Sequence, residues 1–203
     1  IQNVKTSSDQ AAVQVERIVD NYMDDISSSL KLIEGFFLEE DPVRDVNLNH
    51  MADIRSDVTA ITSYDPETGE LTGAWTGHKV FKKDALANLS FNKEEMPELG
   101  EIVISRPHVE SLLLNEYPWV VSISTRIRQA DGTEQIVVLD SRFSQIASYV
   151  DTVGVGSHGY CFIMDQDGTI IYHPQQQLIF AGLKEENTQN MTAHSDGSYE
   201  ENS

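Results

Sequence analysis

The chain has 203 residues and carries 33 acidic against 14 basic side chains, which gives a formal net charge of −19. This charge opposes binding to nucleic acids and to anionic lipid surfaces. No apolar run reaches the roughly 20 residues that cross a bilayer, so we expect any membrane anchor to lie outside this sequence.

The first predicted element is a helix over residues 9–38. Its apolar side chains recur at spacings of three and four residues, which is the pattern of a single apolar helix face. They are Val15, Ile18, Val19, Tyr22, Met23, Ile26, Leu30, Ile33 and Phe37. We expect Ser7, Ser8 or Asp9 to cap its start and Pro42 to lie beyond its end. Because β-rich sequence follows, we interpret this helix as a spine beside a folded domain; a coiled-coil or bundle helix shows the same spacing and remains the alternative.

A short helix and a first pair of strands are predicted next. Residues 46–56 place apolar side chains on one helical side. Residues 58–64 and 70–75 are rich in β-forming side chains, and the segment 65–69 between them has turn residues. We therefore expect a β-hairpin, followed by a helical segment over residues 81–89.

Three further strands are predicted in the middle of the chain. Residues 102–105 form a short strand, and residues 108–114 are expected to be a turn or a short helix. Residues 119–128 and 135–139 are predicted to pair as a hairpin through a turn that contains Gly132. The first of these two strands alternates between Val121, Ile123 and Ile127 on one side and Val120, Ser122 and Ser124 on the other.

A third helix and a second hairpin complete the prediction. Residues 141–150 fit a helix that Asp140 or Ser141 would cap, and the Gly-rich residues 153–159 are expected to connect two domains. Residues 159–174, GYCFIMDQDGTIIYHP, show two apolar runs around a polar turn, which is typical of a β-hairpin.

The hairpin sequence resembles a known family. The stretch GYCFIMDQDGTIIYHP is similar to the opening of a Cache domain, the sensor module that bacterial receptors place outside the membrane. Its continuation over residues 173–187, HPQQQLIFAGLKEEN, resembles the sensor regions of YesM-like histidine kinases. Residues 107–149 are similar to the end of a membrane-distal Cache domain, with strand, Asp-Gly turn, strand, Asp and helix in that order.

The resemblance implies an α+β fold with a double Cache architecture. It divides the chain into a long N-terminal spine helix over residues 1–40, a membrane-distal Cache domain over 41–150 and part of a membrane-proximal Cache domain over 151–203. The distal domain is expected to be PAS-like, with a central antiparallel sheet.

The resemblance also implies where a ligand would bind. Asp140 matches the acid that faces the ligand ammonium in amino-acid-binding members of the family, and helix capping is the alternative role for this residue. His108 falls where those members often have a pocket tyrosine after a proline. The Arg-x-Trp-Tyr phrase that holds the ligand carboxylate in such members is not present between Trp75 and Phe91.

Three aromatic residues are further candidates for the pocket. Trp75, Tyr117 and Trp119 offer ring surfaces that a small molecule such as a sugar would stack on, and packing in the protein core is the alternative for each.

Two segments match known cofactor-binding or metal-binding motifs in part, but neither has the flanking elements or the ligand residues that the motif requires. Residues 154–159 spell a Gly-x-Gly-x-x-Gly phrase, but a helix precedes it and a strand follows, the reverse of the dinucleotide-binding order. Residues 165–168 resemble the start of a calcium loop, whose twelfth position would need a glutamate and has Gln176. We therefore predict no catalytic residue, no metal and no cofactor.

These observations predict the ligand-sensing region of a bacterial transmembrane receptor, on the extracellular side of the membrane and anchored by segments outside this sequence. We expect a small-molecule ligand in the distal domain and a sensor histidine kinase as the output. The alternatives are a chemoreceptor, a diguanylate cyclase, a structural module without a ligand, and an α+β hydrolase. A homodimer through the first helix is a further open alternative.

Overall fold

The structure is a computed structural model that describes residues 2–142, 163–164 and 170–172. The chain divides into two compact units, Asp25–Ser144 in one and Ile1–Asp24 with Gln145–Ser203 in the other. No helix in the described part of the chain is long and apolar enough to span a membrane.

Two helices open the chain. The predicted first helix is confirmed as α1, Gln2–Phe36, and α2 spans Asp41–Ile54. The helix α1 begins before the predicted caps, because serine and aspartate cost only a few tenths of a kcal/mol within a helix and so do not force its start. Pro42 lies in the first turn of α2, where a proline has no hydrogen bond to lose. The apolar face of α1 is buried at Ile26, Leu30 and Ile33.

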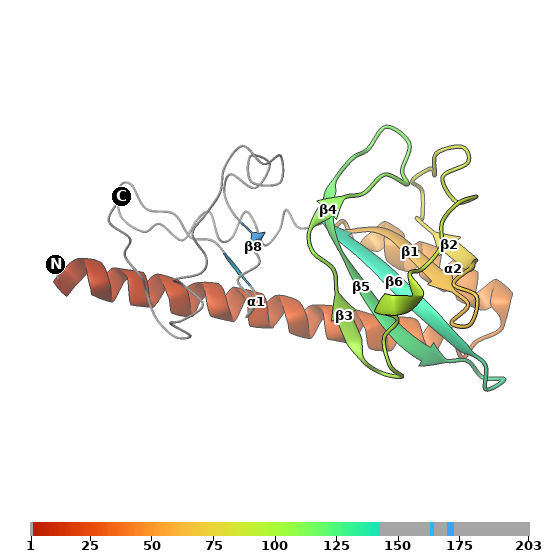
Figure 1. Cartoon of the computed structure of the whole chain (residues 1–203), viewed down its shortest axis with the longest axis horizontal. Helices are drawn as coiled ribbons and strands as arrows, with labels where there is room; N and C mark the ends of the chain where they lie inside the picture. The colour runs from red at the N-terminus through yellow and green to blue at the C-terminus, as the bar shows by residue number, and fades with distance from the viewer. Residues whose placement is uncertain (1, 143–162, 165–169, 173–203) are drawn as a thin grey trace. The chain divides into compact units, whose positions relative to one another are not determined.

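Six strands form one antiparallel sheet in the unit Asp25–Ser144 (Figure 1). They are β1 (Val58–Tyr64), β2 (Leu71–Trp75), β3 (Ile102–Ile104), β4 (His108–Val109), β5 (Trp119–Arg128) and β6 (Glu134–Arg142). The order is β2-β1-β6-β5-β3, and β4 also pairs with β5. The predicted α+β class, with a long N-terminal helix followed by a central antiparallel sheet, is confirmed.

The two predicted hairpins of this sheet form through the turn residues that the sequence offers. Between β1 and β2, the Asp65 Oδ1 atom accepts hydrogen bonds from two backbone N–H groups, at 2.7 and 2.8 Å, and Gly69 has a φ of 77°. Between β5 and β6, the Asp131 Oδ1 atom accepts the Thr133 N–H at 2.9 Å. Gly132 there has a φ of 86°, which glycine adopts without strain.

One face of the sheet packs against the helices. The helix α2 contacts β1 and β2, and Ile61 and Leu139 are cross-strand neighbours that are both fully buried. Trp75, which pairs with Ile61, meets the ring of Phe37 edge to face at 5.9 Å. Successive side chains of a strand point to opposite faces of the sheet. The neighbours of Ile61 and Leu139 along β1 and β6 therefore face the pocket described below.

Two predicted elements are wrong. Residues 81–89 are not helical, because Asp84 has a φ of 66°, which interrupts a right-handed helix. Residues 108–114 begin as strand β4 instead of a turn or helix, because His108 and Val109 pair with β5. A short 3₁₀ helix, η1 (Lys93–Glu95), lies between these segments.

The strand β6 runs through Arg142, so Asp140 lies within the sheet and does not cap a helix. In the other unit, β7 (Ile163–Met164) and β8 (Ile170–Tyr172) pair antiparallel, as the predicted hairpin requires. The helix predicted over residues 141–150 is wrong at its start, because Ser141 and Arg142 belong to β6 and pair with β5. Its remaining residues 143–150, the connector 153–159, the hairpin turn and the segment 173–203 lie outside the described residues.

Candidate ligand pocket

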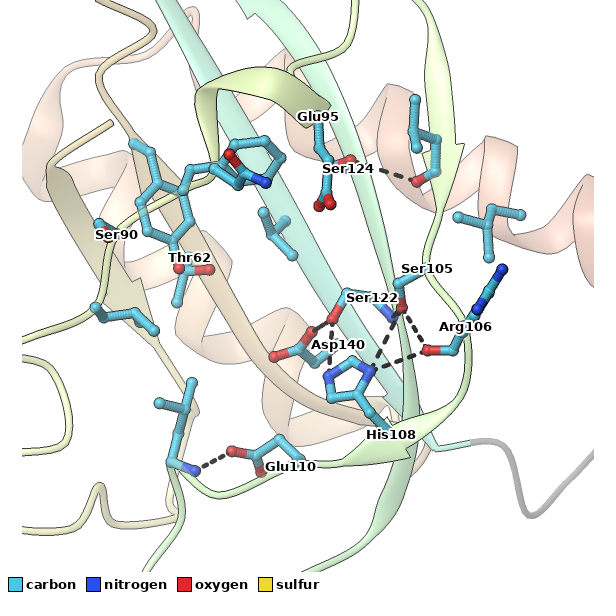
Figure 2. A pocket seen from close by; sticks show the side chains of 18 of the residues that line it. Thr62, Ser90, Glu95, Ser105, Arg106, His108, Glu110, Ser122, Ser124 and Asp140 are labelled. Carbon is cyan, nitrogen blue, oxygen red and sulfur yellow. Dashed lines mark hydrogen bonds between the residues drawn. The ribbon is translucent and has the colours of Figure 1, made fainter. Parts of the chain in front are cut away.

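A pocket of about 850 Å³ lies on the face of the sheet opposite Ile61, Trp75 and Leu139 (Figure 2). Its floor is formed by Thr62 and Tyr64 of β1, Ser122 and Ser124 of β5, and Val138 and Asp140 of β6. Its walls come from residues 89–92, from Glu95 of η1 and from residues 103–106 and 108–112.

Strand register explains why the floor is polar and open. Ser122 lies directly opposite Asp140, and Ser124 lies directly opposite Val138, which also pairs with Thr62 on the other side. These side chains therefore share one face of the sheet. Because three of them are small hydroxyl residues, they leave space that larger apolar side chains would fill.

Asp140 is the buried acid at the centre of this floor. Its residue surface is only 6 % exposed, and the Ser122 hydroxyl donates a hydrogen bond to its Oδ1 atom. Burial raises the pKa of Asp140 to about 6, while the Ser122 hydrogen bond and the nearby His108 oppose the rise. A carboxylate that has lost its water in this way is well placed to pair with a ligand cation.

His108 extends the hydrogen-bond chain from Asp140 to the rim of the pocket. Its Nδ1 atom lies 3.1 Å from the Arg106 carbonyl oxygen, which can only accept, so Nδ1 carries a proton. Its Nε2 atom lies 3.4 Å from the Ser122 hydroxyl oxygen. Because the Ser122 proton is donated to Asp140, a hydrogen bond at this contact requires Nε2 to be the donor. Figure 2 shows the resulting chain from Arg106 through His108 and Ser122 to Asp140.

Glu110 is a second buried acid on the pocket wall, and its residue surface is 3 % exposed. The backbone N–H of Leu112 donates to Oε1, whereas Oε2 is buried without a hydrogen-bond partner among the described residues. Burial raises the pKa of Glu110, although the backbone N–H groups of Leu112 and Leu113 and the charge of Lys82 act in the opposite direction.

The five residues predicted for the pocket separate into two groups. Asp140 and His108 both line it. Trp75, Tyr117 and Trp119 are not among its lining residues. The Trp75 indole N–H donates to Asp45 on the helix side at 3.0 Å, Tyr117 is 62 % exposed, and Trp119 is half-buried at the start of β5.

Sequence reasoning missed Glu110, Ser122 and the β1 residues of the floor. A signal for Ser122 was present, since the alternation in residues 119–128 sets the serines on the side away from Ile123. Nothing local marks Glu110 as buried. Within the described ranges, no group of three or more His, Cys, Asp or Glu side chains is arranged to hold a metal ion.

Comparison with known proteins gives a consistent result at the level of structure. No protein-family model and no curated protein sequence matches the chain. The solved ligand-binding domain of Mlp24 with asparagine has a TM-score of 0.57 at 18% identity, over 87% of this chain and 74% of that one. The ligand-binding domain of the Pseudomonas fluorescens chemoreceptor CtaA with L-valine has a TM-score of 0.59 at 17% identity, over 88% and 78%.

A third solved structure is the ligand-binding domain of the Pseudomonas aeruginosa PAO1 amino-acid chemoreceptor PctC with GABA. Its TM-score is 0.55 at 14% identity, over 87% of this chain and 77% of that one. At these identities the likeness concerns the fold. The chain therefore has the PAS-like, Cache-type α+β fold found in the ligand-binding domains of chemoreceptors.

Proposed function

We propose that this chain is the extracytoplasmic ligand-sensing region of a bacterial transmembrane receptor and that its pocket binds a small molecule. The observation that carries this proposal is the buried Asp140 at the floor of an 850 Å³ pocket, in a fold that chemoreceptors use for ligand binding. Asp140 is proposed to pair with a cationic group of the ligand, and His108 to contribute a polar contact.

The ligands of the similar structures support a cationic group. Asparagine, L-valine and GABA, which are bound to Mlp24, CtaA and PctC, all carry an amino group. A buried carboxylate with one hydroxyl donor has free acceptor positions for such a group. The likeness in fold and the chemistry of Asp140 thus favour the same type of contact.

In this proposal the domain boundaries follow the sequence: a spine over residues 1–40, a distal domain over 41–150 and part of a proximal domain over 151–203. The ligand is bound more tightly by one conformation of the distal domain and shifts the population toward it. The helix α1 would carry this bias toward membrane segments outside the sequence.

The output of the receptor is a separate part of the proposal. The similar structures come from chemoreceptors, which supports a chemoreceptor at least as well as a histidine kinase. The YesM-like phrase at residues 173–187 favours the kinase, and it lies outside the described residues. Fusing the chain to each type of signalling domain and measuring ligand-dependent output would decide between them.

A hydrolase is the competing function, and one observation favours it: Asp140 and Glu110 line the same pocket and both have a raised pKa. The geometry fits nucleophilic catalysis poorly. In a serine hydrolase the histidine lies between the serine and the acid, whereas here Ser122 lies between His108 and Asp140. A substrate panel of esters, amides and glycosides should therefore give no turnover.

The test of the sensing function is a thermal-shift screen of the 203-residue chain against amino acids, amines, carboxylates and sugars. A compound that binds only the folded state stabilises it by about 2.7 kcal/mol at 100 times its dissociation constant. We expect at least one class to raise the melting temperature, and Asp140→Asn to remove the shift. No response from any class would contradict the proposal.

A further inference from the structure

We infer that the face of the sheet opposite Asp140 has a second binding site, which takes a neutral molecule with several hydroxyl groups, of the size of a monosaccharide. A second pocket of about 300 Å³ lies on that face and shares no lining residue with the pocket of the proposed function, the first pocket. Its lining comes from the end of α1, the first turn of α2, strands β1, β2 and β6, and the turn between β5 and β6.

A β-bulge brings Thr72 into the second pocket. Ser63 pairs with Gly73, and the register then shifts by one residue, which leaves Thr72 as the extra residue of β2. Strict alternation from Trp75, which lies on the helix side, would place Thr72 on the side of the first pocket. The bulge turns its hydroxyl to the helix side, where it contacts Ser63 and Gln135.

Hydrogen bonds orient the polar side chains of the second pocket. Thr72 donates its hydroxyl proton to the Gln135 Oε1 atom at 2.6 Å, so the Ser63 hydroxyl is the donor in its 2.8 Å contact with Thr72. In the β5–β6 turn, the Thr133 hydroxyl contacts the Gln129 Oε1 atom at 2.8 Å. The side-chain nitrogen atoms of Gln129 and Gln135 take no part in these contacts and are donors for a bound molecule.

Arg44 is the cation of the second pocket, and its position is fixed by aromatic and acidic neighbours. Its guanidinium carbon lies 5.2 Å from the centre of the Phe37 ring and 5.9 Å from that of the Trp75 ring. Its Nη1 atom pairs with the Asp41 carboxylate at 2.9 Å, and the side chain is only 14 % exposed. A planar group held in this way loses little conformational freedom when it donates to a ligand.

The mixture of groups decides the class of ligand. Phe37 is the only apolar residue that lines the second pocket, so an apolar molecule would cover polar groups without hydrogen-bonding them. The carboxylates of Asp41 and Asp131 oppose an anion, and Arg44 opposes a cation. A hydroxyl group both donates and accepts and is therefore matched by every other lining group. A volume of about 300 Å³ is at the lower end for ligand pockets, which suits a monosaccharide.

NMR titration of the ¹⁵N-labelled 203-residue chain tests the site and the class together. The neutral probes are D-glucose, D-galactose, D-ribose and myo-inositol, and the charged comparisons are ethanolamine and acetate. We expect at least one neutral probe to shift the side-chain amide signals of Gln129 and Gln135 in a saturable manner. Both charged compounds should shift these signals less at the same concentration.

Variants test which residues hold the neutral probe that binds. Gln135→Met removes the amide at nearly constant length, and Thr72→Val removes the hydroxyl at constant shape. Each should weaken binding at least about fivefold, as expected for the loss of a hydrogen bond. Gln14→Met makes the same change at an exposed position of α1 outside the pocket and should leave the affinity unchanged. Circular dichroism and thermal melting establish that each variant is folded.

The outcomes distinguish this site from the first pocket, on which it does not depend. Binding that persists in Asp140→Asn and weakens in Gln135→Met supports the second site, even where the first pocket has no ligand. Binding that is lost in Asp140→Asn and persists in Gln135→Met would assign the sugar to the first pocket and overturn the inference. Equal affinities of Gln14→Met and Gln135→Met, stronger shifts with ethanolamine or acetate, or no saturable shift with any neutral probe would overturn it as well.

Discussion

Asp140 and Ser141 are consecutive residues of β6 whose side chains serve opposite faces of the sheet. Asp140 faces the pocket and accepts the Ser122 hydroxyl. The Ser141 hydroxyl donates to the buried Asp57 Oδ2 at 3.4 Å. Any movement of the β6 backbone at Asp140 therefore also moves Ser141.

The contact of Ser141 continues to the helix α1. Arg55 donates to both carboxylate oxygens of Asp57, at 3.1 and 2.7 Å. The same guanidinium donates at 2.5 Å to the Asp25 carboxylate and at 2.5 Å to the Ser29 hydroxyl, both on α1. The pocket strand and the helix are thus joined by one set of hydrogen bonds centred on Arg55.

Asp140→Asn should stabilise the free protein near neutral pH. Burial raises the pKa of Asp140 to about 6, from an ordinary aspartate value of about 4, so the folded state binds this proton more tightly than the unfolded state. The stabilisation is complete below about pH 4 and is lost as the pH rises through 6, a change of about 3 kcal/mol. Asparagine retains an acceptor for Ser122 and carries no charge.

The measurement is urea unfolding of both proteins at pH 4, 5, 6 and 7.5. The difference in unfolding free energy between variant and wild type should grow in favour of the variant across this range. The other acids titrate alike in both proteins, so their contribution cancels in the difference between the two unfolding free energies. A difference that stays constant with pH would contradict the raised pKa.

Ser122→Ala should raise the pKa of Asp140 above 6. The Ser122 hydroxyl donates to the ionised carboxylate and so lowers its pKa, and alanine removes that donor without adding charge. The pKa is measured by ¹³C NMR of the aspartate carboxyl carbons across a pH series. Ser124→Ala, on the same strand face but opposite Val138, is the matched control and should leave the Asp140 titration in place.

The sequence predicted those parts of the structure that local patterns determine. The helix α1 and the β1–β2 and β5–β6 hairpins follow from apolar periodicity and turn residues. The pocket position of Asp140 was implied by the resemblance to Cache domains, with helix capping as the alternative. The alternation along β5 even separated Ser122 and Ser124 from Val121 and Ile123. Which of the two sides the helices cover depends on packing between distant segments, and the sequence pattern does not contain that information.

Glu110 and β4 are features that local sequence patterns could not predict. A two-residue strand has no periodicity to detect, and β4 exists because residues 119–120 of β5 offer an edge for His108 and Val109. Glu110 then accepts the N–H of Leu112 and is buried. Its environment is a consequence of tertiary pairing, so composition alone marks it as an ordinary surface acid.

Arg55→Ala should destabilise the protein by about 2 kcal/mol. Burial alone would raise the pKa of Asp57, and the hydrogen bonds and charge of Arg55 outweigh it, so this pKa lies below its usual range. Removal of the guanidinium leaves a buried carboxylate with the Ser141 hydroxyl and the Asp57 backbone N–H as donors. The effect is smaller than for a fully buried pair because the Arg55 side chain is 22% exposed.

Urea unfolding at pH 7 measures this loss of stability. Arg55→Lys is the matched variant, because lysine keeps the positive charge but lacks the planar guanidinium group that donates to three side chains. We expect an intermediate stability for the lysine variant. Arg128→Ala removes an arginine whose pair with Glu134 is exposed and should change the unfolding free energy by less than about 1 kcal/mol. Equal effects of Arg55→Ala and Arg128→Ala would contradict the central position of Arg55.

Trp75→Phe should lower stability without changing ligand affinity. Trp75 is buried, its indole N–H donates to Asp45 at 3.0 Å, and its ring packs against Phe37. Phenylalanine loses the hydrogen bond and part of the buried surface, at a cost of about 2 kcal/mol in unfolding free energy. Because Trp75 lies on the helix side of the sheet and not in the pocket, calorimetric titration with a compound that the thermal-shift screen identifies should give the same dissociation constant. Tyr117→Phe, a change at an exposed ring, is the control and should alter neither the stability nor the affinity. A larger dissociation constant in Trp75→Phe alone would show that Trp75 contributes to the ligand site.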